Sequence, residues 1–103
     1  MAIDCRMEQE RMYFRITGEI DHHRAGELMG QLESQLDLES PRQVELDMSG
    51  VTFMDSSGIA LLMRIYRSLN LTGGKLQVVQ VPPQPGKVLK AAGLDRIFSI
   101  SYL

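Results

Sequence analysis

Near the start of the chain, apolar and polar side chains alternate with a period of two. The apolar members of this pattern are Met12, Phe14 and Ile16. A period of two is typical of a strand with one buried face. We therefore expect a strand over residues 11–17, preceded by another over residues 3–8. A tight turn at Gln9-Glu10 joins them, and Gly18 is expected to end the second strand.

Two later segments repeat their apolar residues with the period of a helix. Asp21 is a suitable N-cap for the first helix, which is expected to run from His22 to about Leu36. Its apolar stripe is made of Ala25, Leu28, Met29, Leu32 and Leu36. The second helix is expected to follow Ser57 and to end near Leu69. Its broad apolar arc holds Ile59, Leu62, Met63, Ile65, Tyr66 and Leu69, with Leu61 at the border.

Shorter patterns predict the remaining elements. Strands are expected over Val44–Met48, over residues 76–79 and over Ile97–Ile100, and the apolar run from Val51 also resembles a strand. Prolines 82, 83 and 85 suit a loop and the first turn of a third helix. The inner face of that helix is assigned to Val88, Leu89 and Ala92. Gly93 is expected to end it in a left-handed conformation, with Leu94 closing over the end.

The resulting order is β-β-α-β-α-β-α-β. Strands that alternate with helices predict an α/β fold with a mostly parallel sheet. The two adjoining strands at the start add an antiparallel hairpin, so the sheet is expected to be mixed. A chain of 103 residues has the size of one domain, and no linker or repeat divides it. We expect a single domain over residues 1–103 with helices packed on the sheet.

Charge and composition narrow the class of partner. The net charge of −2 gives no electrostatic reason to expect binding to nucleic acid or to an anionic membrane. The first ten residues carry four charges and lack the apolar centre of a signal peptide. The single cysteine, Cys5, excludes an internal disulfide and is expected to be a buried structural thiol. A cytoplasmic protein that binds another protein is therefore expected.

The segment Asp55-Ser56-Ser57-Gly58 stands where a strand-like run gives way to a helix. Hydroxyl groups at a helix N-terminus lie near unpaired backbone N–H groups and near the positive end of the helix dipole. A phosphate added there would find donors, and it would reverse the local charge. Ser56 is therefore predicted to be a switch that another enzyme phosphorylates. No catalytic residue and no cofactor is expected in the chain itself.

Signatures of catalysis and metal binding are weak. The glycine patterns of dinucleotide and phosphate loops are missing, and Asp55 stands where a nucleophile elbow needs a glycine. A hydrolytic triad of Ser56, Asp55 and either His22 or His23 is disfavoured, because adjacent Asp and Ser make poor relay partners. Adjacent histidines on a helix point about 100° apart, so a metal site is not expected either.

Four segments together resemble the STAS domain of bacterial anti-sigma factor antagonists, in particular those of sporulation. They are Gly18-Glu19-Ile20-Asp21-His22-His23, Phe53-Met54-Asp55-Ser56-Ser57-Gly58, Gly73-Gly74-Lys75 and Ala92-Gly93-Leu94. The resemblance implies that Ser56 is the phosphoacceptor. It also implies that Asp55 and Asp21 lie at the contact with the kinase. The adjoining residues His22, Ser57 and Gly58 are assigned to the same partner-binding site.

The resemblance further implies the partners. An anti-sigma factor that is also a serine kinase would bind the unphosphorylated chain and so release its sigma factor. Phosphorylation of Ser56 would end that binding, and a PP2C-type phosphatase would restore it. Three alternatives remain open. They are a partner-switching module of the stress response, a STAS subunit of a membrane transport complex without phosphorylation, and a small hydrolase that uses Ser56.

Overall fold

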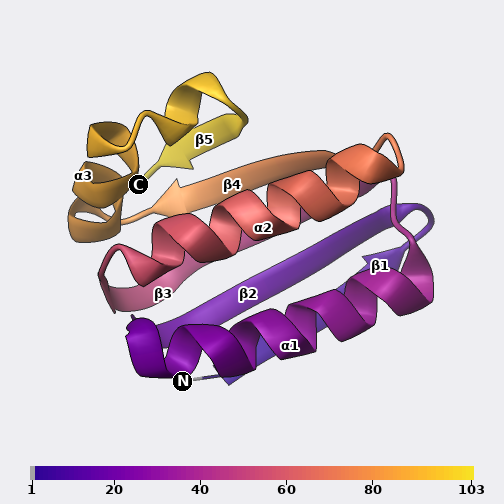
Figure 1. Ribbon diagram of the computed structural model, residues 1–103, viewed down its shortest axis with the longest axis horizontal. Helices are drawn as coiled ribbons and strands as arrows, with labels where there is room; N and C mark the ends of the chain where they lie inside the picture. The colour runs from indigo at the N-terminus through magenta and orange to yellow at the C-terminus, as the bar shows by residue number, and fades with distance from the viewer. Residues whose placement is uncertain (1) are drawn as a thin grey trace.

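The computed structural model describes residues 2–103 and contains five strands and three helices (Figure 1). In chain order these are β1 (Ala2–Glu8), β2 (Arg11–Ile20), α1 (His22–Glu39), β3 (Gln43–Met54), α2 (Ser57–Leu71), β4 (Lys75–Val81), α3 (Pro83–Ala91) and β5 (Ser99–Tyr102). A short 3-10 helix, η1 (Leu94–Arg96), stands between α3 and β5. The predicted order of elements is confirmed.

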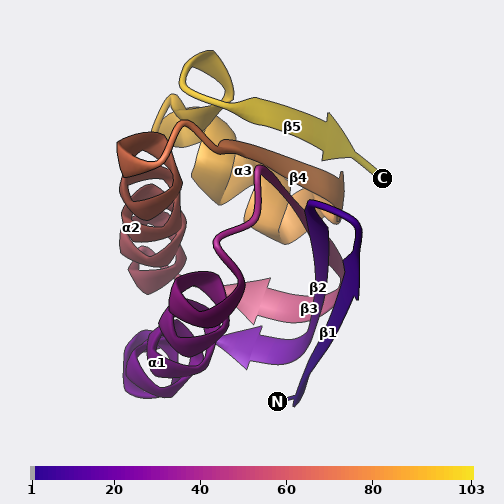
Figure 2. The ribbon, with the colours of Figure 1, turned by 90° about the vertical axis from the view of Figure 1, so that its right-hand side faces the viewer.

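The five strands form one sheet in the order β1-β2-β3-β4-β5. β1 and β2 are antiparallel, and all the other neighbours are parallel. The expected mixed sheet with an N-terminal hairpin is thus confirmed. Figure 2 shows α1 and α2 side by side on one face of the sheet, and Figure 1 shows α3 beyond the end of β4. The carboxyl ends of β2 and β3 therefore lie at the edge where α1 and α2 begin.

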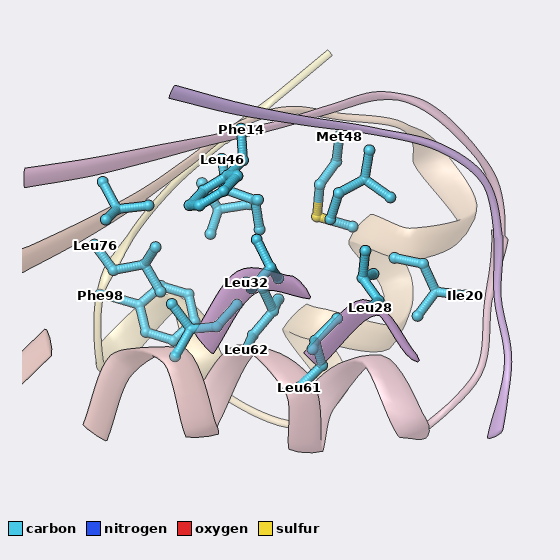
Figure 3. Close-up of a cluster of buried hydrophobic side chains, with 14 of the residues drawn as sticks. Phe14, Ile20, Leu28, Leu32, Leu46, Met48, Leu61, Leu62, Leu76 and Phe98 are labelled. Carbon is cyan, nitrogen blue, oxygen red and sulfur yellow. The ribbon is translucent and has the colours of Figure 1, made fainter. Parts of the chain in front are cut away.

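The hydrophobic core fills the space between the sheet and the two long helices (Figure 3). Phe14, Leu46 and Met48 point from the strands toward Leu28 of α1 and Leu62 of α2. The predicted apolar stripe of α1 is buried at Leu28, Met29, Leu32 and Leu36. Burial of apolar surface stabilises the fold by about 25 cal/mol per Å², so this layer holds α1 and α2 on the sheet.

Two predicted strand ends are wrong. Gly18 does not end β2, because the strand continues to Ile20 with Gly18 at a φ of 99°. Shifts in the β2–β3 pairing near this glycine mark an irregularity that a residue without a side chain accommodates. β3 continues beyond Met48 through Gly50 to Met54 as one strand of 12 residues. A side chain at Gly50 would lie 2.6 Å from Thr17 Cγ2, so the glycine permits this close pairing.

The ends of two other elements, α1 and β5, differ from the predicted ends by a few residues. α1 extends to Glu39, and β5 covers Ser99–Tyr102 instead of Ile97–Ile100. The left-handed glycine after α3 is confirmed, since Gly93 has a φ of 74° and Leu94 behind it is buried.

Three burial assignments are wrong. Leu61 is buried rather than at the border, because α1 packs against that side of α2. Ala92 is exposed, since it already lies at the C-cap of α3. Cys5 is exposed because β1 is an edge strand, and the groove beside it is lined by Gly26 and Gly30 of α1, which have no side chains to cover it.

Candidate functional site

The order of strands and helices brings two segments of the sequence together at one edge of the sheet. β2 ends at Ile20 and is followed by Asp21 and His22, while β3 ends at Met54 and is followed by Asp55. The Asp55 backbone N–H donates to the Ile20 carbonyl oxygen, with an N···O distance of 3.1 Å. This bond continues the pairing of β2 with β3 by one step. The residue before Asp21 is therefore hydrogen-bonded to Asp55, and the two segments lie side by side at the starts of α1 and α2.

The Asp55 side chain accepts a hydrogen bond at the N-terminus of α2. Its Oδ1 accepts a hydrogen bond from the Ser57 backbone N–H at 2.8 Å. That N–H lowers the pKa of Asp55 most, and the Ser57 hydroxyl and the His22 backbone N–H lower it further, against a smaller opposing effect of desolvation. The carboxylate is thus a fixed negative charge beside Ser56.

Ser56 is the N-cap of α2 and is exposed to solvent. Within the described part of the chain its hydroxyl makes no capping hydrogen bond. An exposed hydroxyl without a capping bond is sterically open to an enzyme that would modify it. The predicted position of Ser56, on a solvent-facing helix tip, is confirmed.

The expectation that a phosphate on Ser56 would find free donors at the helix start is wrong. The first three N–H groups of α2 already have acceptors. The Ser57 N–H donates to Asp55 Oδ1, the Gly58 N–H to the Asp55 carbonyl at 3.1 Å, and the Ile59 N–H to the Ser56 carbonyl at 3.1 Å. Because Asp55 takes the place of an anion at this terminus, an added phosphate meets a negative charge and few donors.

Asp21 caps α1, as predicted. Its Oδ1 accepts from the Arg24 backbone N–H at 2.8 Å, and its carbonyl accepts from the Ala25 N–H at 2.9 Å. The histidines that follow, His22 and His23, are exposed. Across residues 2–103, no group of three or more His, Cys, Asp and Glu side chains gathers that could hold a metal ion.

Ser57 and Gly58 differ in what they offer to a partner. Ser57 is half-buried, and its backbone N–H donates to Asp55 Oδ1 at 2.8 Å, so this residue helps to order the turn. Gly58 is buried, and a side chain there would overlap Sδ and Cγ of Met54. Gly58, predicted from the sequence to belong to the partner-binding site, is thus buried, and it serves the close approach of α2 to the end of β3.

A shallow groove adjoins the site between the first turns of α1 and α2. It is lined by His22, Ala25, Gly26, Met29, Ser57, Ala60, Leu61 and Arg64. Arg64 forms an ion pair with Glu33 of α1, with 2.7 Å between Nε and Oε1. The groove connects Ser57 with the apolar side of α1, so a partner that covers Ser56 would also have apolar surface to bury.

Sequence patterns gave no sign of one further contact at the site. The Gln84 side chain of α3 is hydrogen-bonded to the backbone of Met54, the residue before Asp55. The two residues are thirty positions apart, so no local periodicity links them.

The lowered pKa of Asp55 predicts a response to acid. In the unfolded chain this carboxyl regains its ordinary pKa of 3.8, so the unfolded state binds more protons than the native state below about that pH. Above a pH of about 3.8, the charged carboxylate contributes its full stabilisation of the native state. This stabilisation is lost as the pH falls through the lower native pKa. Thermal unfolding midpoints from about pH 2 to pH 7 should therefore decline less steeply in acid for Asp55→Asn than for wild type. If the unfolding midpoints of the two proteins fell equally steeply with pH, the lowered pKa of Asp55 in the native state would be contradicted.

Comparison with known proteins places the whole chain in one family. The family model of the STAS domain matches residues 2–102. A curated relative, the anti-sigma F factor antagonist of Paenibacillus polymyxa, is 29% identical over 102 residues, covering 97% of this chain and 87% of the relative. The anti-sigma-B factor antagonist of Staphylococcus aureus is 23% identical over 94 residues, covering 90% of this chain and 86% of the relative.

Solved structures share the fold. The anti-sigma factor antagonist SpoIIAA in its unphosphorylated form superposes with a TM-score of 0.83 at 23% identity, covering 96% of this chain and 87% of that chain. The phosphorylated form of SpoIIAA from Bacillus gives a TM-score of 0.75 at 24% identity, covering 96% of this chain and 90% of that chain. At these identities the likeness shows the fold. No helix within residues 2–103 has the length and apolar character needed to cross a membrane.

Proposed function

This chain belongs to the STAS domain family, and we propose that it is an anti-sigma factor antagonist that phosphorylation of Ser56 switches off. The names of two curated relatives, both antagonists of anti-sigma factors, support the general role. The observation that carries the switch is the exposed Ser56 hydroxyl beside the fixed charge of Asp55. In this proposal the unphosphorylated chain binds the anti-sigma factor, and the sigma factor is released.

The charge of the turn explains why a phosphate would act as a switch. A phosphoserine carries about −1.5 to −2 charges near neutral pH. At Ser56 that charge would lie beside the Asp55 carboxylate, while the N–H groups of the first turn of α2 are already bonded. A partner that covered the turn would have to remove water from both anions, which costs several kcal/mol unless it supplies a cation. Binding can therefore be lost without a change of fold.

The proposed partners follow from the same turn. The anti-sigma factor would itself be the serine kinase that transfers the phosphoryl group from ATP to Ser56, and a PP2C-type phosphatase would remove it. Asp21, His22, Asp55 and Ser57 would form the contact surface, and Gly58 would shape it from within. The chain itself would be no enzyme and would act in the cytoplasm, in the regulation of sporulation.

Incubation with the cognate anti-sigma factor and labelled ATP tests the proposal. We expect label on Ser56 in wild type and none in Ser56→Ala, while Ser68→Ala, which removes a hydroxyl near the other end of α2, keeps its label. The labelled protein, isolated and mixed with fresh anti-sigma factor, should no longer bind. Label that persists in Ser56→Ala, or a labelled protein that binds like the unlabelled one, would contradict it.

A second pathway deserves the same assay, because one relative is named an antagonist of anti-sigma-B rather than of anti-sigma F. The switch would be the same and only the partner would change. Titrating the chain with each anti-sigma factor of its own organism decides between the two. The true partner should bind the unphosphorylated chain at least about a hundredfold more tightly than the other, a difference of about 3 kcal/mol.

A further inference from the structure

The end of β3 has no partner strand on the β4 side, and a side chain completes its hydrogen bonding there. Pairing between β3 and β4 stops at Asp47 and Val79, although β3 continues to Met54. At Met54, the backbone N–H donates to Gln84 Oε1 at 2.9 Å, and Gln84 Nε2 donates to the Met54 carbonyl at 2.8 Å. The Gln84 amide thus gives Met54 one acceptor and one donor, as a residue of a neighbouring strand would.

Gln84 is held in place by its own helix. It is the second residue of α3, between Pro83 and Pro85, and Pro82 is the N-cap. Proline fixes φ near −65°, so the backbone on both sides of Gln84 has little freedom. The Gly86 N–H also donates to the Pro82 carbonyl at 2.8 Å, which closes the first turn. The amide that reaches Met54 therefore projects from a rigid base.

We propose that Gln84 is a positioning residue for the phosphorylation of Ser56, an inference that rests on the proposed function. Two opposite anchors fix the chain directly before Ser56. On the β2 side the Asp55 N–H donates to the Ile20 carbonyl, and on the α3 side Gln84 holds both backbone groups of Met54. The Ser56 hydroxyl has no capping bond of its own, so the place from which its side chain projects depends on the backbone that these anchors hold.

Removing the Gln84 amide would free this backbone on one side. Met54 is fully buried, so its N–H and carbonyl would lose their partners where water is scarce. The turn would then sample orientations in which the hydroxyl is misplaced for phosphoryl transfer. A displacement of about 1 Å at a reacting group can slow a reaction about a hundredfold. We expect kcat for phosphorylation of Ser56 to fall at least about tenfold, with KM within about twofold because the exposed surface of the site is unchanged.

The test uses Gln84→Met, which keeps the length of the side chain and removes both hydrogen bonds. Leu36→Ala, at a buried position near the C-terminal end of α1, is the control for lost stability. The rate of amide hydrogen exchange at Met54 measures directly how well Gln84 protects this N–H, and the measurement needs no kinase. Its protection should drop at least about tenfold more in Gln84→Met than in Leu36→Ala, and only Gln84→Met should lower kcat.

The outcomes separate this inference from the proposed function. Suppose that wild type is phosphorylated on Ser56. Gln84 is then not a positioning residue if Gln84→Met has the same kcat as wild type, or if Leu36→Ala lowers kcat as much as Gln84→Met does. Unchanged exchange at Met54 would overturn the anchor itself. If wild type takes up no label while exchange at Met54 responds as expected, the anchor stands and the phosphorylation proposal fails.

Discussion

Replacing Ser56 with Asp is expected to weaken binding of the anti-sigma factor at least about a hundredfold, which corresponds to about 3 kcal/mol. The new carboxylate would stand on the exposed N-cap next to Asp55, whose own carboxylate already occupies the start of α2. Both charges would lose water under a partner, and little in the turn remains to compensate the second one. Isothermal titration calorimetry of the two purified proteins measures the effect.

Ser56→Asn is the matched control, because Asn has nearly the size of Asp and no charge. It should bind at least about tenfold more tightly than Ser56→Asp if charge is the cause. Ser56→Ala should bind like wild type, since the Ser56 hydroxyl makes no capping bond whose loss would disturb the helix. Equal weakening by Asn and Asp would show that size at this position prevents binding, and the charge argument would fail.

Replacing Gly58 with Ala is expected to lower the free energy of unfolding by about 1–3 kcal/mol. The added methyl group would overlap Sδ and Cγ of Met54. Met54 is fully buried below the start of α2 and cannot move aside into solvent. Either α2 must lift from the end of β3, or the methionine must leave its rotamer. Urea unfolding followed by circular dichroism gives the free energy.

Gly30→Ala is the matched control, because it also replaces a helical glycine by alanine. Nothing lies within 4 Å of a side chain at Gly30, so this change should raise stability by about 0.5–1 kcal/mol. The cause of the Gly58 effect can be checked by adding Met54→Ala. The double variant should be more stable than the sum of the two single changes by at least about 0.5 kcal/mol. Strict additivity would exclude a clash between the two side chains.

The helices and strands could be predicted because their signals are local. The alternation from Met12 to Ile16 fixed the type and inner face of β2, and the spacing of Leu28, Leu32 and Leu36 did the same for α1. The cap at Asp21 and the left-handed Gly93 were read from single residues. Each of these features depends on neighbours within about one helical turn or one strand, where sequence and geometry correspond directly.

The ends of elements and the burial of edge residues could not be read in this way. Gly18 looked like a strand end, but β3 pairs with the residues on both sides of it, so β2 continues through its positive φ. Cys5 looked like a buried strand residue, but its strand is the edge of the sheet and faces two glycines. In both cases the decisive neighbour lies far away in the sequence.

By itself, the sequence determined an α/β domain with Ser56 on an exposed helix start, because apolar periodicity and the residues at a helix cap act over a few positions. The tertiary structure alone decided how that start is built. In that structure the Asp55 carboxylate accepts the first N–H of α2, and Met54 is hydrogen-bonded to Gln84, thirty residues away. The physical reason is that hydrogen bonds between segments depend on which strands and helices become neighbours, and only the packed core settles that.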